Sequence, residues 1–205
     1  MSEARSRVAS TCFYRNTMQS NNIINNMIGK GGNDECYTPS NVVEAIAPYV
    51  PEGKVIWCPF DKEDSAFVQV LGGRNKVIHS HIDDGQDFFI YEPSEQWDMI
   101  ISNPPFSGKS KVLKRVISFG KPFALLLPYM MGNDPAPIRL FHARGIQLQM
   151  LLFVERIDFM QKSPRSDKKQ PFKSVFYCTD LLTRDLITVS LDEVGIQNNN
   201  NLSLF

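Results

Sequence analysis

Four consecutive residues, Asn103, Pro104, Pro105 and Phe106, carry the clearest chemistry in this 205-residue sequence. The Asn103 side-chain oxygen and the backbone carbonyl of Pro104 can both accept hydrogen bonds from one exocyclic NH2 group, which localises the lone pair on its nitrogen. Proline stiffens the loop, so these acceptors are held in place before a substrate arrives. Phe106 offers a flat face on which a planar base can stack. The group predicts a site that activates a planar amine, and the alternative is a turn that only ends a strand.

An alternation of short apolar runs and helix-like segments predicts the framework that holds this motif. Strands are expected at 54–58, 76–79, 97–102 and 123–127, and helices over 40–49, 66–71 and 112–117, with Ser40 as a helix cap. Such alternation is typical of βαβ units and predicts an α/β fold with a doubly wound, mostly parallel sheet. The alternation stops after Pro128, and 148–154 and 174–178 are expected to form an antiparallel edge pair. Ligands bind beyond the carboxyl ends of parallel strands, where residues 103–106 stand.

The order of these features resembles the class I S-adenosylmethionine-dependent amino-methyltransferases, and most closely a DNA adenine-N6 methyltransferase-like family of phages and mobile elements. The resemblance spans about residues 35–180 and rests on the segments 37–39, 55–60, 87–89, 100–106 and 121–128. It implies a Rossmann-like methyltransferase sheet with S-adenosyl-L-methionine as the cofactor. It further implies methyl transfer to the N6 nitrogen of adenine in DNA, with Asn103 to Phe106 as the catalytic NPPF motif. A base in a duplex must flip out to reach such a pocket, where Tyr129 could help Phe106 to stack on it.

The same resemblance implies which residues border the cofactor. Tyr37, Thr38 and Pro39 would lie at its methionine end, and Asp87 and Phe88 near its adenine. The acidic residue that relatives use after the second strand to hold the ribose hydroxyls is not evident, and Asp61, Asp64 or His81 could take over that contact. The full predicted cofactor-binding set is Tyr37, Thr38, Pro39, Cys58, Pro59, Phe60, Asp61, Asp64, His81, Asp87 and Phe88. Three of these residues have structural alternatives: Thr38 as a helix cap, Asp87 in a surface turn and Phe88 in the core.

The loop after the first predicted strand, residues 58–65, contains no glycine. Backbone approaches a cofactor most easily where there is no Cβ, so this loop predicts S-adenosylmethionine binding weaker than the roughly micromolar values common for metabolite sites. It favours the alternative that the chain is a catalytically degenerate methyltransferase fold that binds nucleic acid or protein. A second alternative is an enzyme that methylates RNA bases or a protein glutamine amide, which present the same planar NH2. The order Cys58-Pro59 is not the Pro-Cys of pyrimidine C5 chemistry, so Cys58 is interpreted as structural.

Charge is divided sharply along the chain although the total is zero. Residues 31–100 hold thirteen Asp or Glu and four Lys or Arg, whereas residues 101–176 hold four Asp or Glu and thirteen Lys or Arg. A basic surface attracts a polyanion through counterion release. The resemblance implies that this polyanion is DNA, with RNA as the alternative. The other interpretation is that the two blocks are solvated faces that attract each other. The predicted nucleic-acid-binding residues are Lys109, Lys111, Lys114, Arg115, Lys162, Arg165, Lys168 and Lys169.

Composition predicts a soluble globular protein, with 42% hydrophobic and 21% charged residues. Residues 1–36, rich in Asn, Ser and Gly, predict a flexible N-terminal arm, followed by a methyltransferase-like domain at 37–190 and a C-terminal tail at 191–205. The polar N-terminus and the lack of an apolar run of roughly 18 residues predict a cytoplasmic location without membrane contact. The four cysteines have no metal-ligand spacing, so no metal site is expected. The oligomeric state is not predicted.

Overall fold

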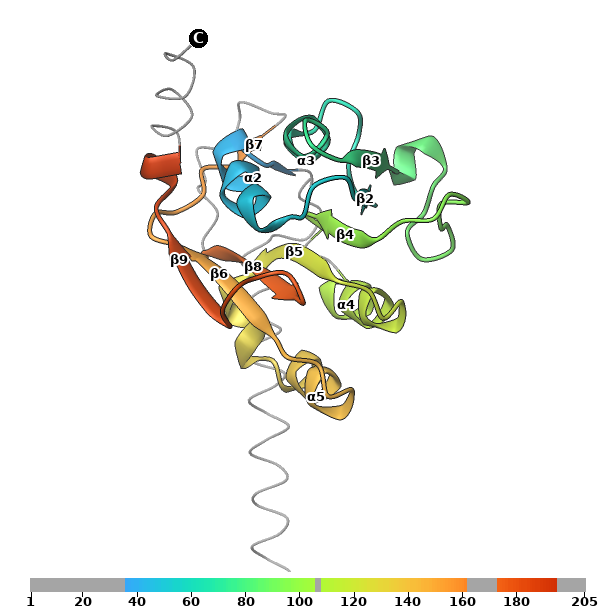
Figure 1. Ribbon diagram of the computed structural model, residues 1–205. Coiled ribbons are helices and arrows are strands. Elements are labelled where there is room, and N and C mark those ends of the chain that lie inside the picture. The colour runs from blue at the N-terminus through green and yellow to red at the C-terminus, as the bar shows by residue number, and fades with distance from the viewer. Residues whose placement is uncertain (1–35, 106–107, 162–172, 195–205) are drawn as a thin grey trace, which may run out of the picture. The chain divides into compact units, whose positions relative to one another are not determined.

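The structure is a computed structural model that describes residues 36–105, 108–161 and 173–194. These residues form an α/β fold around a seven-stranded sheet (Figure 1). The strand order is β3 (Lys76–His79), β2 (Val55–Cys58), β4 (Met99–Ser102), β5 (Phe123–Pro128), β8 (Ser174–Thr179), β6 (Gln149–Phe153) and β9 (Leu186–Val189). A separate ladder pairs β1 (Cys36–Tyr37) antiparallel with β7 (Met160–Gln161). No helix among the described residues is long and apolar enough to cross a membrane.

Strand directions confirm the predicted doubly wound, mostly parallel sheet. The strands β2, β3, β4 and β5 are parallel to their neighbours in this group, and β8 runs antiparallel to both β5 and β6. The expected antiparallel pair near 148–178 is therefore present as β6 and β8. The sheet edge itself is formed by β9, which pairs parallel with β6 and was not predicted. Its side chains alternate between exposed and half-buried, which is common in an edge strand.

Helices cover both faces of the sheet. On one face lie α2 (Ser40–Ile46) and α3 (Ala66–Leu71), and on the other lie α4 (Lys109–Ser118) and α5 (Pro135–Ala143) (Figure 1). Successive strand residues point to opposite faces, so Ile101 packs in the core beneath α2 and α3, whereas Ile100 packs in the core beneath α4. Every residue of β4, β5 and β8 is buried, which accounts for their nearly continuous apolar sequences.

Two local details differ from the sequence expectations. The alternation of strands and helices continues past Pro128 with α5, which the sequence analysis missed because Pro135 and Pro137 look like helix breakers. Both prolines lie in the first helical turn, where backbone N–H groups have no partner inside the helix, and Asp134 caps that turn by accepting from the Ala136 N–H at 3.1 Å. Ser40 is not a helix cap, because Pro39 precedes α2 and no side chain caps that helix.

The chain reverses direction across the sheet at β2. From β2 it crosses through α3 to β3 on one side, and it then returns to place β4 on the other side of β2. The carboxyl ends of β2 and β4 therefore flank the point where the strand order reverses, which is where open α/β sheets bind ligands. Residues 59–65 follow β2 and Asn103 follows β4, so two segments of the predicted site meet at this point.

The predicted domain limits fall at the borders of the described residues. The predicted arm, apart from Cys36 in β1, and the tail beyond Val194 lie outside them. Leu191 is buried and belongs to the core, so the packed part of the chain extends past residue 190. The division into arm, domain and tail stays a prediction.

Candidate functional site

Asn103 lies directly after β4, and its side-chain amide is only half satisfied. Its Nδ2 donates to the Thr38 hydroxyl oxygen at 3.1 Å, which orients the amide. Its Oδ1 is buried and has no hydrogen-bond partner among the described residues. A buried acceptor without a partner costs about 1–3 kcal/mol, and such atoms are rare in folded proteins. The orphan oxygen is thus a ready acceptor for an N–H group of a ligand.

The residues after Asn103 keep this amide in place. Pro104 is buried and Pro105 half-buried, and each proline ring fixes its own φ angle. A stiff loop retains its shape whether or not a ligand is present. Phe106 lies outside the described residues, so its role in stacking stays a prediction.

Asp61 is a buried carboxyl that comes from the loop after β2. The hydroxyl of Ser102, the residue before Asn103, donates to Asp61 Oδ2 at 2.5 Å. Burial raises the pKa of Asp61 from 3.8 to about 6, and hydrogen bonds from Ser102 and Ser65 lower it in part because they stabilise the carboxylate. At neutral pH a mostly ionised, buried carboxylate therefore lies at the carboxyl ends of β2 and β4.

The glycine-free loop from Pro59 to Ser65 is held by ordinary residues. Ser65 caps α3 by accepting from the Val68 N–H at 3.3 Å, and its backbone N–H donates to the Lys62 carbonyl at 3.0 Å. Lys62 forms an ion pair of 2.6 Å with Asp83 in the 3₁₀ turn η2 (Ile82–Asp84) after β3. No residue of the loop has a positive φ angle. The loop conformation therefore needs no glycine, and the lack of glycine affects only how closely a ligand can approach the backbone.

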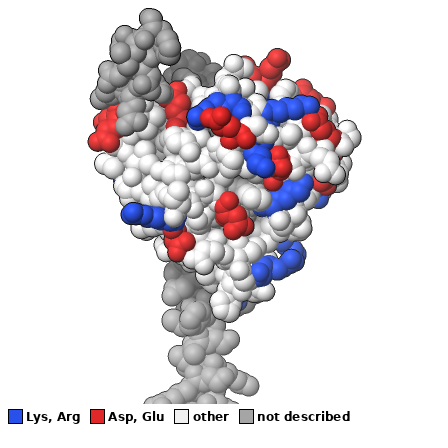
Figure 2. All heavy atoms as spheres, in the orientation of Figure 1, with Lys and Arg blue, Asp and Glu red and all other residues white. Residues whose placement is uncertain are grey.

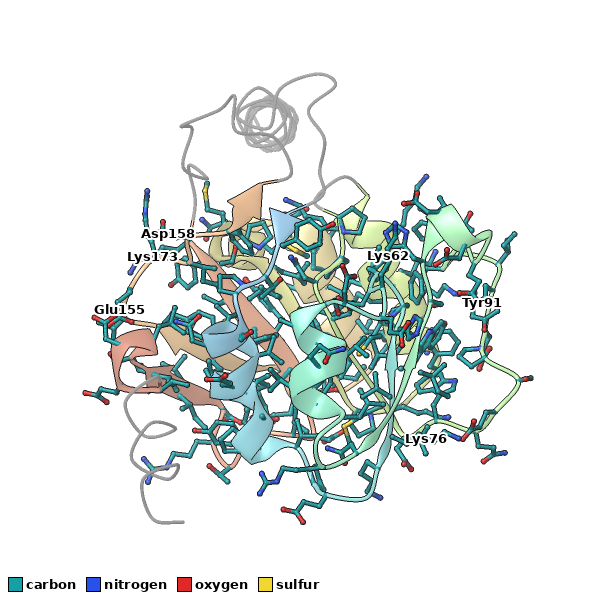
Figure 3. All side chains as sticks on the ribbon, turned by 90° about the horizontal axis from the view of Figure 1, so that it is seen from above. Lys62, Lys76, Tyr91, Glu155, Asp158 and Lys173 are labelled. Carbon is teal, nitrogen blue, oxygen red and sulfur yellow. The ribbon has the colours of Figure 1, made fainter. Side chains whose placement is uncertain are left out.

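The loop after β2 and the turn after β3 lie at the carboxyl edge of the parallel strands. Figure 3 labels Lys62, after β2, and Lys76, at the start of β3, at opposite ends of these strands. Asp64 is exposed, so Asp61 is the acidic residue of this loop that lies inside the site. His81 Nδ1 accepts from the Asp83 N–H at 3.1 Å and so caps η2. Its predicted contact with the cofactor would have to come from the other ring nitrogen.

Asp87 and Phe88 lie in local structure that matches the alternatives stated for them. Asp87 Oδ1 accepts from the Phe89 N–H at 2.9 Å within a surface turn. Phe88 is 3% exposed and its ring lies 4.8 Å from that of Phe60 and 5.5 Å from that of Trp57. Phe60, Phe88 and Trp57 form an aromatic cluster, and Phe60 is its member in the loop after β2. The cofactor roles of these residues stay predictions.

Two other predicted residues have clear surroundings. Thr38 is buried and accepts from Asn103, so it borders the motif rather than capping α2. Cys58 is fully buried, and burial together with nearby Asp61 raises the pKa of its thiol well above the usual value. A thiol that stays protonated is a poor nucleophile, in accord with its interpretation as structural. Tyr37 and Pro39 flank Thr38 and are half-buried.

The predicted nucleic-acid-binding residues of α4 differ in their surroundings. Lys111 and Lys114 are exposed. Arg115 donates to the Tyr91 carbonyl at 3.1 Å, and its guanidinium lies 5.4 Å from the Phe88 ring and 5.0 Å from the Phe119 ring. The guanidinium of Arg115 therefore packs against aromatic rings of the protein. The sequence gives a signal for this contact, because Phe119 stands four residues after Arg115. The remaining four predicted residues, Lys162, Arg165, Lys168 and Lys169, lie outside the described residues.

Lys109, the first residue of α4, has an unusual position. Its Nζ is buried and has no hydrogen-bond partner among the described residues. Burial lowers the pKa of this ammonium group, and the carboxylate of Asp134 opposes that effect. The group is a cation that a ligand anion could satisfy.

Sequence reasoning missed the polar contacts that support the site. Ser102 was placed in the strand without a role, yet it joins Asp61 to the residue before the motif. The hydroxyl of Ser80, at the end of β3, accepts from Trp57 Nε1 at 2.9 Å, and both residues are fully buried. Serines at the carboxyl ends of β3 and β4, the two strands that flank β2, were the signal that could have found them. No three described His, Cys, Asp or Glu residues lie close enough together to hold a metal ion.

Comparisons with known proteins do not assign this chain to a family. No protein-family model matches the sequence, and no curated protein matches it. A solved structure assigned as a methyltransferase from Thermoplasma acidophilum shares 12% identity and a TM-score of 0.38, covering 68% of this chain and 73% of that one. A predicted O-methyltransferase from Agrobacterium tumefaciens shares 9% identity and a TM-score of 0.37, covering 74% and 84%. Similarities this distant assign no substrate or activity to the chain.

Proposed function

We propose that this protein is an S-adenosylmethionine-dependent methyltransferase that acts on the exocyclic N6 nitrogen of adenine in DNA. The observation that carries the proposal is the orphan oxygen of Asn103, buried at the point where the strand order reverses. The Pro104 carbonyl follows it in a loop stiffened by two prolines. This arrangement supports a site for a planar NH2 group.

The residues of the motif act on the amine of the substrate. Asn103 Oδ1 accepts one N–H of the target amino group, and the Pro104 carbonyl accepts the other. Two acceptors on the amine localise its lone pair on the nitrogen, and this lone pair forms the new bond to carbon. Because these acceptors are fixed beforehand, no reorganisation is needed as charge develops on the nitrogen. Positioning of this kind can supply much of the rate.

The residues at the carboxyl ends of β2 and β4 fit S-adenosylmethionine by charge. The cofactor supplies a methyl group on a positively charged sulfur, and it also carries an ammonium group. Asp61 presents a buried carboxylate, and such a charge is stabilised by a cation nearby. Thr38 borders Asn103, and the half-buried ring of Phe60 offers an apolar face beside Phe88. Asp61, Thr38 and Phe60 are the residues that would hold the cofactor.

A second candidate function is a binder of nucleic acid that has lost the methyl-donor site. The structure after β3 favours this candidate. The hydroxyl of Ser80 there is already hydrogen-bonded to Trp57, and none of the described residues at that position presents a buried carboxylate. A buried acidic side chain at that position could hold the ribose hydroxyls of a nucleoside. Together with the glycine-free loop, this arrangement favours weak or absent donor binding.

Two measurements separate these functions. Calorimetric titration with S-adenosylmethionine tests the donor site, and transfer of a labelled methyl group is assayed on DNA, RNA and protein in parallel. We expect label on the N6 nitrogen of adenine in DNA. Label on RNA or on a glutamine amide would assign the same motif to another acceptor. Salt-sensitive DNA binding without donor binding or transfer would establish the non-catalytic binder.

A further inference from the structure

An exposed aromatic residue stands at the carboxyl end of β5. Tyr129 is the first residue of the 3₁₀ turn η3 (Tyr129–Asn133), and 49% of its surface is exposed. Met130 beside it is 37% exposed. Tyrosine presents a large rigid face with few rotatable bonds, so an exposed tyrosine on a fixed backbone is suited to stacking.

The backbone of η3 is held by a buried hydroxyl. Tyr177 of β8 is 2% exposed, and its hydroxyl donates to the Tyr129 carbonyl and accepts from the Gly132 N–H, each at 2.9 Å. The Tyr129 N–H also donates to the Lys173 carbonyl at 2.8 Å. Burial raises the pKa of Tyr177 to about 12, so the hydroxyl keeps its proton at physiological pH. Both backbone polar groups of Tyr129, its N–H and its carbonyl, are therefore held by hydrogen bonds.

The turn η3 is a neighbour of the Asn103 loop. The parallel strands β4 and β5 are paired, so the segments that follow them leave the same edge of the sheet. The residue after η3, Asp134, interacts electrostatically with Lys109, which follows the Asn103 loop at the start of α4. Asn103 and Lys109 each contribute a buried polar atom that lacks a partner among the described residues.

We propose that Tyr129 is the stacking platform for the unpaired base that Asn103 receives, and that Tyr177 is the residue that positions this platform. The inference rests on the proposed function, because it assumes a nucleotide in the Asn103 site. The three groups match the three parts of a nucleotide: an aromatic face for the ring, an amide oxygen for the exocyclic amine and an unpaired ammonium for a phosphate. A peptide amide would match the amide oxygen but offers neither an aromatic ring nor an anion.

The test uses the full chain and a DNA oligonucleotide with 2-aminopurine at the target position. The fluorescence of this base reports stacking, and the titration also gives a dissociation constant. We expect Tyr129→Ala to weaken binding on the order of 10-fold and to abolish most of the fluorescence change. Tyr129→Phe should retain both properties because it keeps the ring. The control is Leu186→Ala, which changes an exposed apolar residue on the edge strand β9. This variant should match the wild type.

Tyr177→Phe tests the positioning role without removing the buried ring. We expect a reduced 2-aminopurine signal and a raised KM for DNA, with kcat changed less, because a mobile platform weakens the hold on the base. The salt dependence of binding should not change, since no phosphate contact is removed. Thermal unfolding of each variant checks that the fold is retained.

The outcomes distinguish this inference from the proposed function. Wild-type fluorescence and KM in Tyr129→Ala would overturn the platform, even if adenine methylation is found. A fluorescence change that depends on Tyr129, in a protein that transfers no methyl group, would support the platform and reject the enzyme. Loss of the signal in Tyr129→Ala with full retention in Tyr177→Phe would overturn the positioning role of Tyr177.

Discussion

Asn103 is a residue whose contribution to stability and whose proposed contribution to catalysis can be separated. Replacement by Ala removes its hydrogen bond to Thr38, worth about 1 kcal/mol, but it also removes a buried acceptor without a partner, which costs about 1–3 kcal/mol. We expect the free energy of unfolding of Asn103→Ala to be unchanged or higher by up to about 2 kcal/mol in urea titrations. Methyl transfer should fall about 100-fold, as for the loss of one preorganised polar contact.

The matched control for this variant is Asn75→Ala. Asn75 Oδ1 accepts from the Lys54 N–H at 2.9 Å at the other end of the parallel strands. This variant should lose about 1 kcal/mol of stability and keep its methyl-transfer rate. Full transfer to adenine by Asn103→Ala would show that the assignment of the motif is wrong.

Asp61 makes the protein less stable as the pH rises. A carboxyl whose pKa is raised from 3.8 to about 6 by folding binds more protons in the folded state than in the unfolded state between these two values. Its contribution is therefore most favourable below about pH 4, declines as the pH rises and is lost above about pH 6. The shift corresponds to about 3 kcal/mol. A buried charge that costs this much is typical of a functional site.

The variant Asp61→Asn tests this cost. We expect its free energy of unfolding to exceed that of the wild type by up to about 3 kcal/mol at pH 8 and by only about 1 kcal/mol at pH 4.5. S-adenosylmethionine binding, measured by calorimetry, should be weaker than in the wild type at pH 8. In the wild type this affinity should fall as the pH drops through about 6, and in the variant it should not. The exposed Asp64→Asn is the control, and equal donor affinity in both variants would remove Asp61 from the site.

At the scale of elements, the sequence predicted those parts whose signals are local. The strand β3 has the predicted bounds 76–79, and α3 ends before Gly72 as expected, because apolar runs bounded by glycine or proline mark such elements directly. The helix α5 was missed because a proline in a first turn has the same sequence signal as a helix breaker. The edge strand β9 is short and only half-buried, so its pattern is weak.

The candidate site was predictable only where strand ends determine it. Asn103 follows a buried strand, and its place at the carboxyl edge follows from the parallel sheet. Whether Asp61 or Asp64 points inward depends on how one loop turns, which no periodicity reports. Arg115 was predicted to bind nucleic acid from its charge alone, whereas its contacts with Phe88 and Phe119 depend on tertiary packing.

The pair of Trp57 and Ser80 joins the ends of β2 and β3 and leads to a test of element packing. Ser80→Ala would leave Trp57 Nε1 buried without an acceptor, which costs about 1–3 kcal/mol. We expect that loss in urea unfolding. Ser118→Ala removes a hydroxyl bond at an exposed helix end and should change stability by less than about 0.5 kcal/mol. Equal stabilities of the two variants would show that the Trp57 indole finds another partner.

At the scale of the whole molecule, the few cations of the acidic block are paired within that block. All four cations of residues 31–100 form ion pairs with acids of the same block: Lys54 with Asp98, Lys62 with Asp83, Arg74 with Glu52 and Lys76 with Glu95. None of the ion pairs between described residues joins this block to the basic block 101–176. The interpretation that the two blocks hold each other by direct pairing therefore gains no support. Arg115 and Lys121 of the basic block donate to the Tyr91 and Trp97 carbonyls, whereas the exposed Lys111 and Lys114 form no ion pair with another described residue.

These cations do not form one continuous basic surface on the face that Figure 2 shows, where both signs are interspersed among uncharged residues. In the proposed complex with DNA, the phosphate contacts from the described part of the chain would come from a few exposed side chains, chiefly Lys111 and Lys114 on α4. Each phosphate contact contributes about 0.9 to the slope of log K against log salt concentration. Two lysines would thus account for a measurable part of the slope.

The double variant Lys111→Gln, Lys114→Gln tests this contribution. We expect weaker DNA binding at low salt and a salt slope that is smaller in magnitude by roughly 2, because two counterion-releasing contacts are lost. Methyl transfer at saturating DNA should stay close to the wild-type rate, since neither side chain belongs to the Asn103 site. The control is Lys76→Gln, an exposed lysine of β3 that pairs with Glu95, and its slope should not change. An equal slope in the double variant and the wild type would place the DNA contacts elsewhere on the chain and remove α4 from the proposed interface.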